Sequence, residues 1–225
     1  MSSILYLLLA ALIGYIAGSI PNGFIMVKLI KGIDIREVGS GRTGGTNSMR
    51  AAGFPVGFAV SIMDVLKGAL GVWVTQFLLV QLGVSSHEPL LIWAQICAGI
   101  FSVVGHNWSI FLGFRGGAGT GPNVGWATAI WWPFFPISLV VMPLMLVLVG
   151  MASLASIVMG VVIPVFFTIL YFTRVIDSPI YILGGLITLG IVLWALRPNI
   201  GRMLRGEERL VGPRARRKQQ QGSSS

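Results

Sequence analysis

The chain has 225 residues, of which 55% are hydrophobic and only 10% are charged, and its formal net charge is +9. A soluble globular domain has about 25% charged residues, so this composition excludes a soluble or disordered protein, and several long apolar runs exclude a single-pass anchor. We therefore predict an all-α, polytopic membrane protein, and we attribute the basic excess to cytoplasmic loops rather than to nucleic-acid binding.

Six apolar runs follow one another along the chain. A transmembrane helix needs about 20 residues, and most of the runs approach or exceed this length. The runs cover residues 4–28, 54–82, 89–105, 122–149, 152–172 and 179–196. The fourth run contains Pro133, Pro136 and Pro143, so it forms either one tilted helix or two shorter helices.

The basic residues decide between these alternatives. If the fourth run is one helix, the basic segment that begins at Arg197 lies outside the cell, which violates the positive-inside rule. If it forms two helices at 118–132 and 136–150, every basic residue except Lys67 and Arg174 is cytoplasmic. We therefore predict seven transmembrane helices, with the N-terminus outside and the C-terminus in the cytoplasm.

The two ends of the chain differ in composition. No basic region precedes the first apolar run, so we interpret this run as the first span rather than as a cleaved signal peptide. We assign residues 1–212 to the membrane domain. Residues 213–225 are basic and then rich in glutamine and serine, which is typical of a disordered tail.

Polar residues interrupt the first two spans. Gly18, Pro21 and Gly23 break the first run, either to line a cavity or to form a structural kink. Asp64 and Lys67 are three residues apart in the second run, so they share one face of a helix. Charges within a span are costly and usually paired, so we predict that Asp64 pairs with Lys67 or with a loop arginine, and the alternative is a direct role in substrate binding.

Two glycine-rich segments are predicted to face the cytoplasm. The first extends from Gly39 to Arg50 and the second from Gly105 to Gly121. Glycine lets backbone N–H groups approach an anion, and arginine adds bidentate contacts to phosphate. We predict an anion-binding site, and the alternative is that the glycines only permit turns and close packing. The predicted substrate-binding residues are Gly39, Gly41, Arg42, Gly44, Thr46, Asn107, Arg115, Gly116, Gly117 and Gly119.

Neither segment matches a nucleotide-binding motif. Gly39, Gly41 and Gly44 form a GxGxxG pattern, but a membrane span rather than a strand precedes it. His106 acts either as a general base or as a hydrogen-bonded interfacial residue, and Phe111 stands where a His-x4-Asp dyad needs its acid. Because the sequence has no Cys/His cluster and no suitably spaced carboxylate pair, we predict no metal and no other cofactor.

These motifs resemble those of the bacterial acyl-phosphate-dependent glycerol-3-phosphate acyltransferases. The matching segments are 18–23, 34–50, 64–68, 105–119 and 199–208. The resemblance implies a seven-helix enzyme of the bacterial plasma membrane with a cytoplasmic active site. Such enzymes move a fatty acyl group from acyl phosphate to the 1-hydroxyl of glycerol 3-phosphate, giving lysophosphatidic acid and phosphate. The expected partners are these two substrates and membrane lipids, and we expect a monomer.

The resemblance also implies which residues carry the reaction. The implied catalytic residues are Ser40, Asn47, Arg50, His106 and Ser156. For Ser156, and for Ser153 beside it, the structural alternative is a helix cap.

Four positions depart from the pattern of this family. Arg42 replaces asparagine, Gly45 replaces alanine, Ala118 replaces lysine and Leu196 replaces histidine. Losing one charge-assisted contact costs about 1.5–3 kcal/mol, and Arg42 or Arg115 could restore the charge of the lysine. We interpret the chain as a divergent acyltransferase. The alternatives are a paralogue with another acceptor or donor, a non-catalytic lipid-binding or partner membrane protein, and a small-anion transporter.

Overall fold

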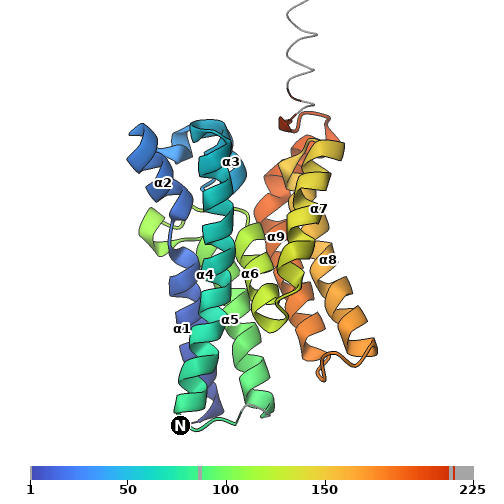
Figure 1. The fold of residues 1–225 in the computed structure, drawn as a ribbon. Coiled ribbons are helices and arrows are strands. Elements are labelled where there is room, and N and C mark those ends of the chain that lie inside the picture. Colours follow the sequence, from blue (N-terminus) through green and yellow to red (C-terminus); the bar gives the residue numbers. More distant parts are fainter. Residues whose placement is uncertain (1, 86–87, 213–214, 216–225) are drawn as a thin grey trace, which may run out of the picture.

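The computed structural model describes residues 2–85, 88–212 and 215, and it confirms the all-α prediction (Figure 1). Nine α-helices and two short 3-10 helices occur in this part of the chain. They are α1 (Ser3–Ser19), α2 (Asn22–Lys31), η1 (Ile35–Glu37), α3 (Gly45–Ala52), α4 (Phe54–Gln81), α5 (Pro89–Asn107), η2 (Ile110–Leu112), α6 (Thr120–Ile130), α7 (Phe134–Leu148), α8 (Ala152–Phe172) and α9 (Ile180–Leu204). The tail predicted at 213–225 lies outside the described residues, apart from residue 215.

Five helical stretches of the described chain are long and apolar enough to cross a membrane. They are Ser3–Lys31, Phe54–Gln81, Pro89–Leu112, Ala152–Phe172 and Ile180–Leu204. The other two predicted spans correspond to α6, which has 11 residues, and α7, which has 15. Both are shorter than the about 20 residues that a perpendicular crossing needs. The seven-span count and the orientation of the termini therefore stay predictions.

The fourth apolar run forms two helices rather than one. α6 ends at Ile130, and the next residue, Trp131, adopts an extended conformation with φ −146° and ψ 99°. Pro133 then precedes α7 as its N-cap residue. Proline suits this position because the first N–H groups of a helix have no intrahelical acceptor.

The first apolar run is broken at Ile20 and Pro21, between α1 and α2. Lys67 Nζ donates to the Ile20 carbonyl at 2.7 Å, and Asn22 Nδ2 donates to Asp64 Oδ1 at 3.1 Å. Lys67 Nζ also lies 2.9 Å from Asp64 Oδ1, which confirms the mutual ion pair. Lys67 thus bonds a backbone carbonyl at the break, and Asp64 bonds the side chain of Asn22, the first residue of α2.

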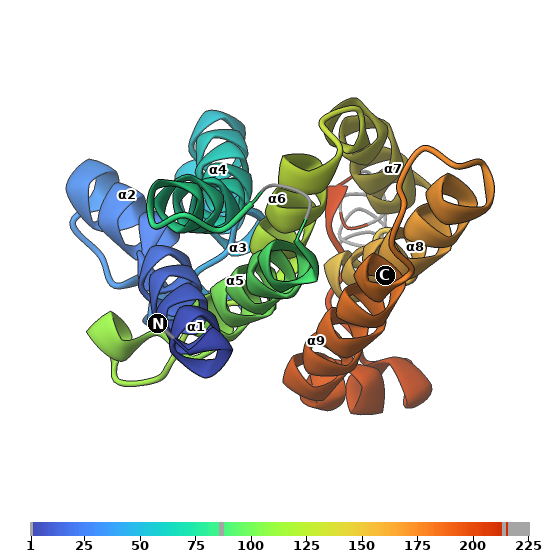
Figure 2. The same cartoon turned by 90° about the horizontal axis from the view of Figure 1, so that it is seen from below.

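The helices form two groups, α1–α6 and α7–α9, that lie side by side (Figures 1 and 2). Helix α9 packs on α5, and α8 packs on α6. The ring of Trp126 on α6 stacks on Phe167 of α8 with a centroid distance of 5.1 Å, and Phe167 stacks on Tyr181 of α9 at 5.7 Å. The contact of Trp126 with Phe167 joins the two groups, and the contact of Phe167 with Tyr181 lies within the second group.

Candidate active site

A cavity of about 350 Å³ lies where the two groups of helices meet. The segment before α3, the starts of α6 and α8 and the end of α9 form its polar wall, and α4 and α7 form its apolar wall. All five implied catalytic residues line it, namely Ser40, Asn47, Arg50, His106 and Ser156. Arg42, Gly44 and Thr46 are the predicted substrate-binding residues that line it within the described chain.

Asn47 holds the first glycine segment in shape. Its Oδ1 accepts a hydrogen bond from the backbone N–H of Ser40 at 3.0 Å. Its Nδ2 donates to the carbonyls of Val38 and Arg42, both at 2.9 Å, and lies 3.2 Å from that of Ile35. Because its amide is fully used by the backbone, Asn47 shapes the cavity wall rather than offering a free group to a substrate.

The first glycine segment is part turn and part helix, although the sequence suggested a loop throughout. Gly39 and Gly41 have φ values of +57° and +71°, which strongly favour glycine. The segment then enters α3, because its later residues contain no proline and tolerate helical geometry. Gly44 precedes α3 as its N-cap residue, and a Cβ there would meet no atom within 4 Å. Gly44 therefore leaves the approach to the helix start open.

The second glycine segment packs tightly against the end of α5. A Cβ at Gly117 would lie 1.9 Å from His106 Nε2, and one at Gly116 would lie 2.0 Å from the His106 carbonyl oxygen. Gly119 has φ +85° and is the N-cap residue of α6. These glycines do not line the cavity, and they serve close packing, which was the structural alternative.

Two other residues predicted in this segment also lie off the cavity. Arg115 is exposed and does not line it, so this structure offers no contact by which Arg115 compensates for Ala118. Asn107 is 5% exposed, and neither polar atom of its side chain has a hydrogen-bond partner among the described residues. A Cβ on Gly119 would lie 3.0 Å from Asn107 Oδ1, so glycine leaves room for this amide.

His106 faces an acid that the sequence spacing did not reveal. His106 Nδ1 lies 3.7 Å from Asp64 Oδ1, and both residues line the cavity. Asp64 is shared with Lys67 and Asn22, so this polar cluster draws residues from α2, α4 and α5. A search at fixed spacing from His106 misses this acid, because only the packing of α4 on α5 brings it near.

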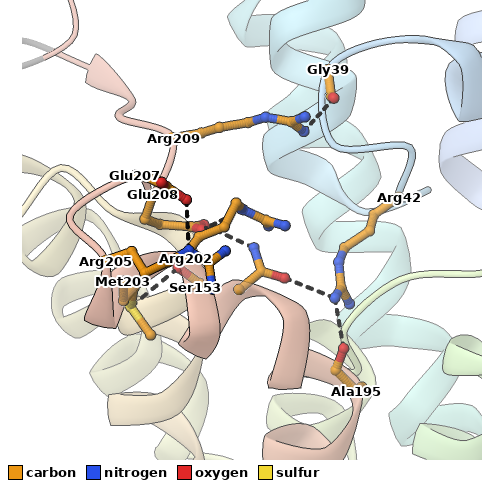
Figure 3. A network of polar contacts seen from close by, with 11 residues as sticks. Gly39, Arg42, Ser153, Ala195, Arg202, Met203, Arg205, Glu207, Glu208 and Arg209 are labelled. Carbon is orange, nitrogen blue, oxygen red and sulfur yellow. Dashed lines mark hydrogen bonds and ion pairs between the residues drawn. The ribbon is translucent and has the colours of Figure 1, made fainter.

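Arg42 links the first glycine segment to the second and to α9. Its Nη1 donates to the Gly117 carbonyl at 3.0 Å. Its Nη2 donates to the Ala195 carbonyl at 2.6 Å and to Asn199 Oδ1 at 2.9 Å (Figure 3). Burial and the charge of Arg202 hold the pKa of Arg42 below its usual value, but arginine stays protonated at neutral pH.

Arg50 presents an unpaired cation to the cavity. It is exposed, and it forms neither a hydrogen bond nor an ion pair with any described residue. Arg209 also lines the cavity, and its Nη1 donates to the Gly39 carbonyl (Figure 3). Arg42, Arg50 and Arg209 all line the cavity, and these three cations favour an anionic ligand.

The segment after α9, residues 205–211, closes the polar wall. Glu208 Oε1 accepts from Ser153 Oγ at 2.9 Å and from Asn199 Nδ2 at 2.8 Å, and its Oε2 lies 3.0 Å from Arg202 Nε. Leu210 pairs with Met151, the residue before α8. The predicted site residues did not include Glu208 or Arg209. The one indication for Glu208 in the sequence was its position in segment 199–208, the last segment that resembles the family.

Three helices of the described chain begin at the cavity, and the first backbone N–H groups of each have no intrahelical acceptor. The helices are α3 through Gly45 and Thr46, α6 through Thr120 and Gly121, and α8 through Ala152. The first N–H groups of a helix have no intrahelical acceptor and carry a partial positive charge, so they attract anions. Neither predicted serine caps α8, because Ser156 Oγ bonds the Ala152 carbonyl and Ser153 bonds Glu208.

The cavity continues as an apolar groove between α4 and α7. Side chains on α4 and α7 line it, and several are partly exposed. They are Phe54, Phe58, Ile62, Val65, Phe135, Leu139, Met142, Pro143 and Leu146. One cavity therefore combines a cationic end with a groove suited to a hydrocarbon chain. Among the described residues, no group of three His, Cys, Asp or Glu side chains is placed to hold a metal.

Known proteins resemble this chain over most of its length. A family model described as glycerol-3-phosphate acyltransferase matches residues 8–206. The glycerol-3-phosphate acyltransferase of Gloeobacter violaceus is 35% identical over 199 residues, covering 88% of this chain and 91% of that protein. Glycerol-3-phosphate acyltransferase 2 of Moorella thermoacetica is 35% identical over 219 residues, covering 92% and 99%.

Solved structures show the same similarity. A crystal structure of PlsY, an integral membrane glycerol 3-phosphate acyltransferase in its glycerol 3-phosphate form, superimposes with a TM-score of 0.74 at 30% identity. It covers 92% of this chain and 96% of that one. A second PlsY structure, in its lysophosphatidic acid form, superimposes with a TM-score of 0.73 at 29% identity.

Proposed function

The chain belongs to the glycerol-3-phosphate acyltransferase family, and from this premise we propose that it is an active, divergent member that uses acyl phosphate as its donor. In the proposed reaction, the 1-hydroxyl oxygen of glycerol 3-phosphate attacks the carbonyl carbon of a fatty acyl phosphate. An ester C–O bond forms, the C–O bond to phosphate breaks and the hydroxyl proton passes to the departing phosphate, so that the products are lysophosphatidic acid and phosphate.

One observation carries this proposal: a single cavity is cationic at one end and apolar along the rest. Arg50 and Arg209 lie at the cationic end, and Phe58, Leu139 and Met142 line the apolar groove. Acyl phosphate has a charged head and a hydrocarbon chain, so its two parts match the two parts of the cavity. Glycerol 3-phosphate carries a second phosphate and no apolar part, so it requires only the cationic end.

The residues at the cationic end support catalysis by positioning and by electrostatics. The Arg50 guanidinium and the free N–H groups of three helix starts favour the phosphate groups of both substrates. A phosphate of a mixed anhydride is a good leaving group, so the reaction needs little acid catalysis. Holding the hydroxyl next to the carbonyl and stabilising the negative charge that develops there supply the main rate enhancement. Ser40, Ser156 and His106 line the same space and offer polar side chains.

The proposed setting is a bacterial plasma membrane with the cavity open to the cytoplasm. The segments that carry Arg42, Arg50 and Arg209 lie at one end of the bundle, as the positive-inside rule predicts for a cytoplasmic face. The acyl chain then enters from the lipid, and glycerol 3-phosphate enters from the cytosol. We further propose that the protein acts as a monomer.

The donor is tested with radiolabelled glycerol 3-phosphate and purified protein in lipid vesicles. Palmitoyl phosphate is offered in one reaction, and palmitoyl-CoA in another. We expect labelled lysophosphatidic acid from palmitoyl phosphate alone. Product from the thioester alone would overturn the proposed donor, and labelled product from neither would overturn the activity.

A further inference from the structure

Arg42 lies between the second glycine segment and α9. Within the described chain, neither of these two elements has a lysine or an arginine that lines the cavity. The Arg42 guanidinium bonds the carbonyls of Gly117 and Ala195. The residues that follow these two are Ala118 and Leu196, and both of their side chains line the cavity. Arg42, Ala118 and Leu196 are the three positions that differ in charge or polarity from the family pattern that this chain resembles. They therefore form one patch of the cavity wall, although they are far apart in the sequence.

The contacts of Arg42 leave it able to meet a ligand. Its guanidinium donates to two backbone carbonyls and one side-chain amide oxygen, so no carboxylate neutralises it by direct contact within the described chain. These bonds use three of the five N–H donors of a guanidinium. Arg42 is half-buried and is one of the residues that line the cavity, so a phosphate bound in the cavity would be near its charge.

The small side chain at position 118 belongs to the same arrangement. A lysine there would extend from the residue that follows Gly117, whose carbonyl already accepts from Arg42. Two positive charges that lie close together in a partly buried site repel each other. We therefore expect a lysine at position 118 to be favourable only when position 42 has no cation, and the reverse.

We propose that Arg42 takes over the role of the lysine that Ala118 replaces. Arg42 supplies the positive charge that binds phosphate beside the second glycine segment, and the small side chain of Ala118 leaves space for it. This proposal rests on the function proposed above, because it assigns one phosphate contact of that site. It makes a distinctive prediction: the effect of Ala118→Lys on phosphate binding reverses sign when the charge of Arg42 is removed.

The test measures the Kd for glycerol 3-phosphate by calorimetry, together with KM, kcat and the melting temperature. The variants are Arg42→Gln, Ala118→Lys and the double variant. Glutamine keeps an N–H donor for the carbonyls and removes the charge, and Arg42→Lys serves as a second variant that retains the charge. Arg205→Gln is the matched control, because Arg205 pairs with exposed Glu207 and does not line the cavity.

Arg42→Gln is expected to raise the Kd and KM for glycerol 3-phosphate by about 10- to 100-fold, which is the loss of one charge-assisted contact. Ala118→Lys alone is expected to weaken binding, whereas in the double variant it restores at least about tenfold of the loss. Arg42→Lys is expected to lie between wild type and Arg42→Gln, and Arg205→Gln is expected to match wild type.

Three results would overturn the proposal. They are an unchanged Kd in Arg42→Gln, an effect of Ala118→Lys with the same sign in both backgrounds, and a wild-type protein that binds neither glycerol 3-phosphate nor inorganic phosphate. A wild-type protein that binds glycerol 3-phosphate but forms no lysophosphatidic acid would contradict only the function proposed above.

Discussion

Asn47 shows how one buried amide determines the shape of a binding segment. It is 2% exposed, and it bonds one backbone N–H and several backbone carbonyls around the turn that precedes α3. The resemblance implies a catalytic role for Asn47, and the hydrogen bonds of its amide hold the backbone at Ser40 and Arg42 in place. The motif marked Asn47 as important, but the sequence could not show where its amide groups point.

Asn47→Asp tests this positioning role. Aspartate keeps an oxygen that accepts from the Ser40 N–H. It replaces the Nδ2 donor, however, with a negatively charged oxygen that is surrounded by carbonyls. Leaving buried carbonyls without donors costs about 1–3 kcal/mol each, so the melting temperature and the activity are expected to fall together. A normal melting temperature with activity lost would instead indicate direct contact with substrate.

Other site residues differ in how far the sequence could predict them. Arg50 and Arg42 were predictable, because arginines in a glycine-rich segment favour anions whatever their exact geometry. Arg209 was not, because its contact with Gly39 depends on how the chain turns after α9. Asp64 was predicted as an ion-pair partner of Lys67, but its approach to His106 required the packing of two helices.

The packing of α1 on α5 shows why glycine is frequent in helices that cross a membrane. A Cβ at Gly14 would lie 2.1 Å from the Ala98 carbonyl oxygen, and one at Gly18 would lie 2.1 Å from that of Ser102. The two backbones therefore approach each other directly, as small residues allow in the absence of a hydrophobic driving force. The run of apolar residues predicted the helix but not which of its glycines lie at the interface.

Gly14→Ala and Gly190→Ala form a matched pair that tests this interface. Gly14→Ala is expected to destabilise the protein by about 1–3 kcal/mol, because overpacking forces α1 and α5 apart. A Cβ at Gly190 in α9 would meet nothing within 4 Å, so Gly190→Ala is expected to be neutral or to stabilise by up to about 1 kcal/mol. Thermal unfolding in detergent measures both, and equal melting temperatures would contradict the predicted close contact.

The whole molecule places two groups of helices around one amphiphilic cavity. The first group supplies the glycine segments and α4, and the second supplies α7, the start of α8 and the end of α9. Hydropathy predicted the long helices, and the prolines together with the basic residues predicted the division into α6 and α7. The cavity itself was not predictable, because it results from the closure of residues 205–211 over segments that lie far away in sequence.

The groove between α4 and α7 predicts a dependence on acyl chain length. Leu139 lines this groove and is 42% exposed, so Leu139→Trp narrows it without changing the cationic end. The variant is expected to lower kcat/KM for palmitoyl phosphate by about tenfold and to spare decanoyl phosphate, since each buried CH₂ contributes about 0.8 kcal/mol. Equal losses for both donors would show that the chain lies elsewhere.

The proposed function requires that this cavity binds the phosphates and transfers the acyl group despite its altered residues. The most direct measurement is phosphate release from palmitoyl phosphate and glycerol 3-phosphate by the wild-type protein, Arg50→Ala and the exposed control Arg205→Ala, all in vesicles. We expect phosphate release that requires both substrates, falls at least about tenfold in Arg50→Ala and persists in the control. Release that ignores glycerol 3-phosphate, or equal rates in Arg50→Ala and wild type, would contradict it.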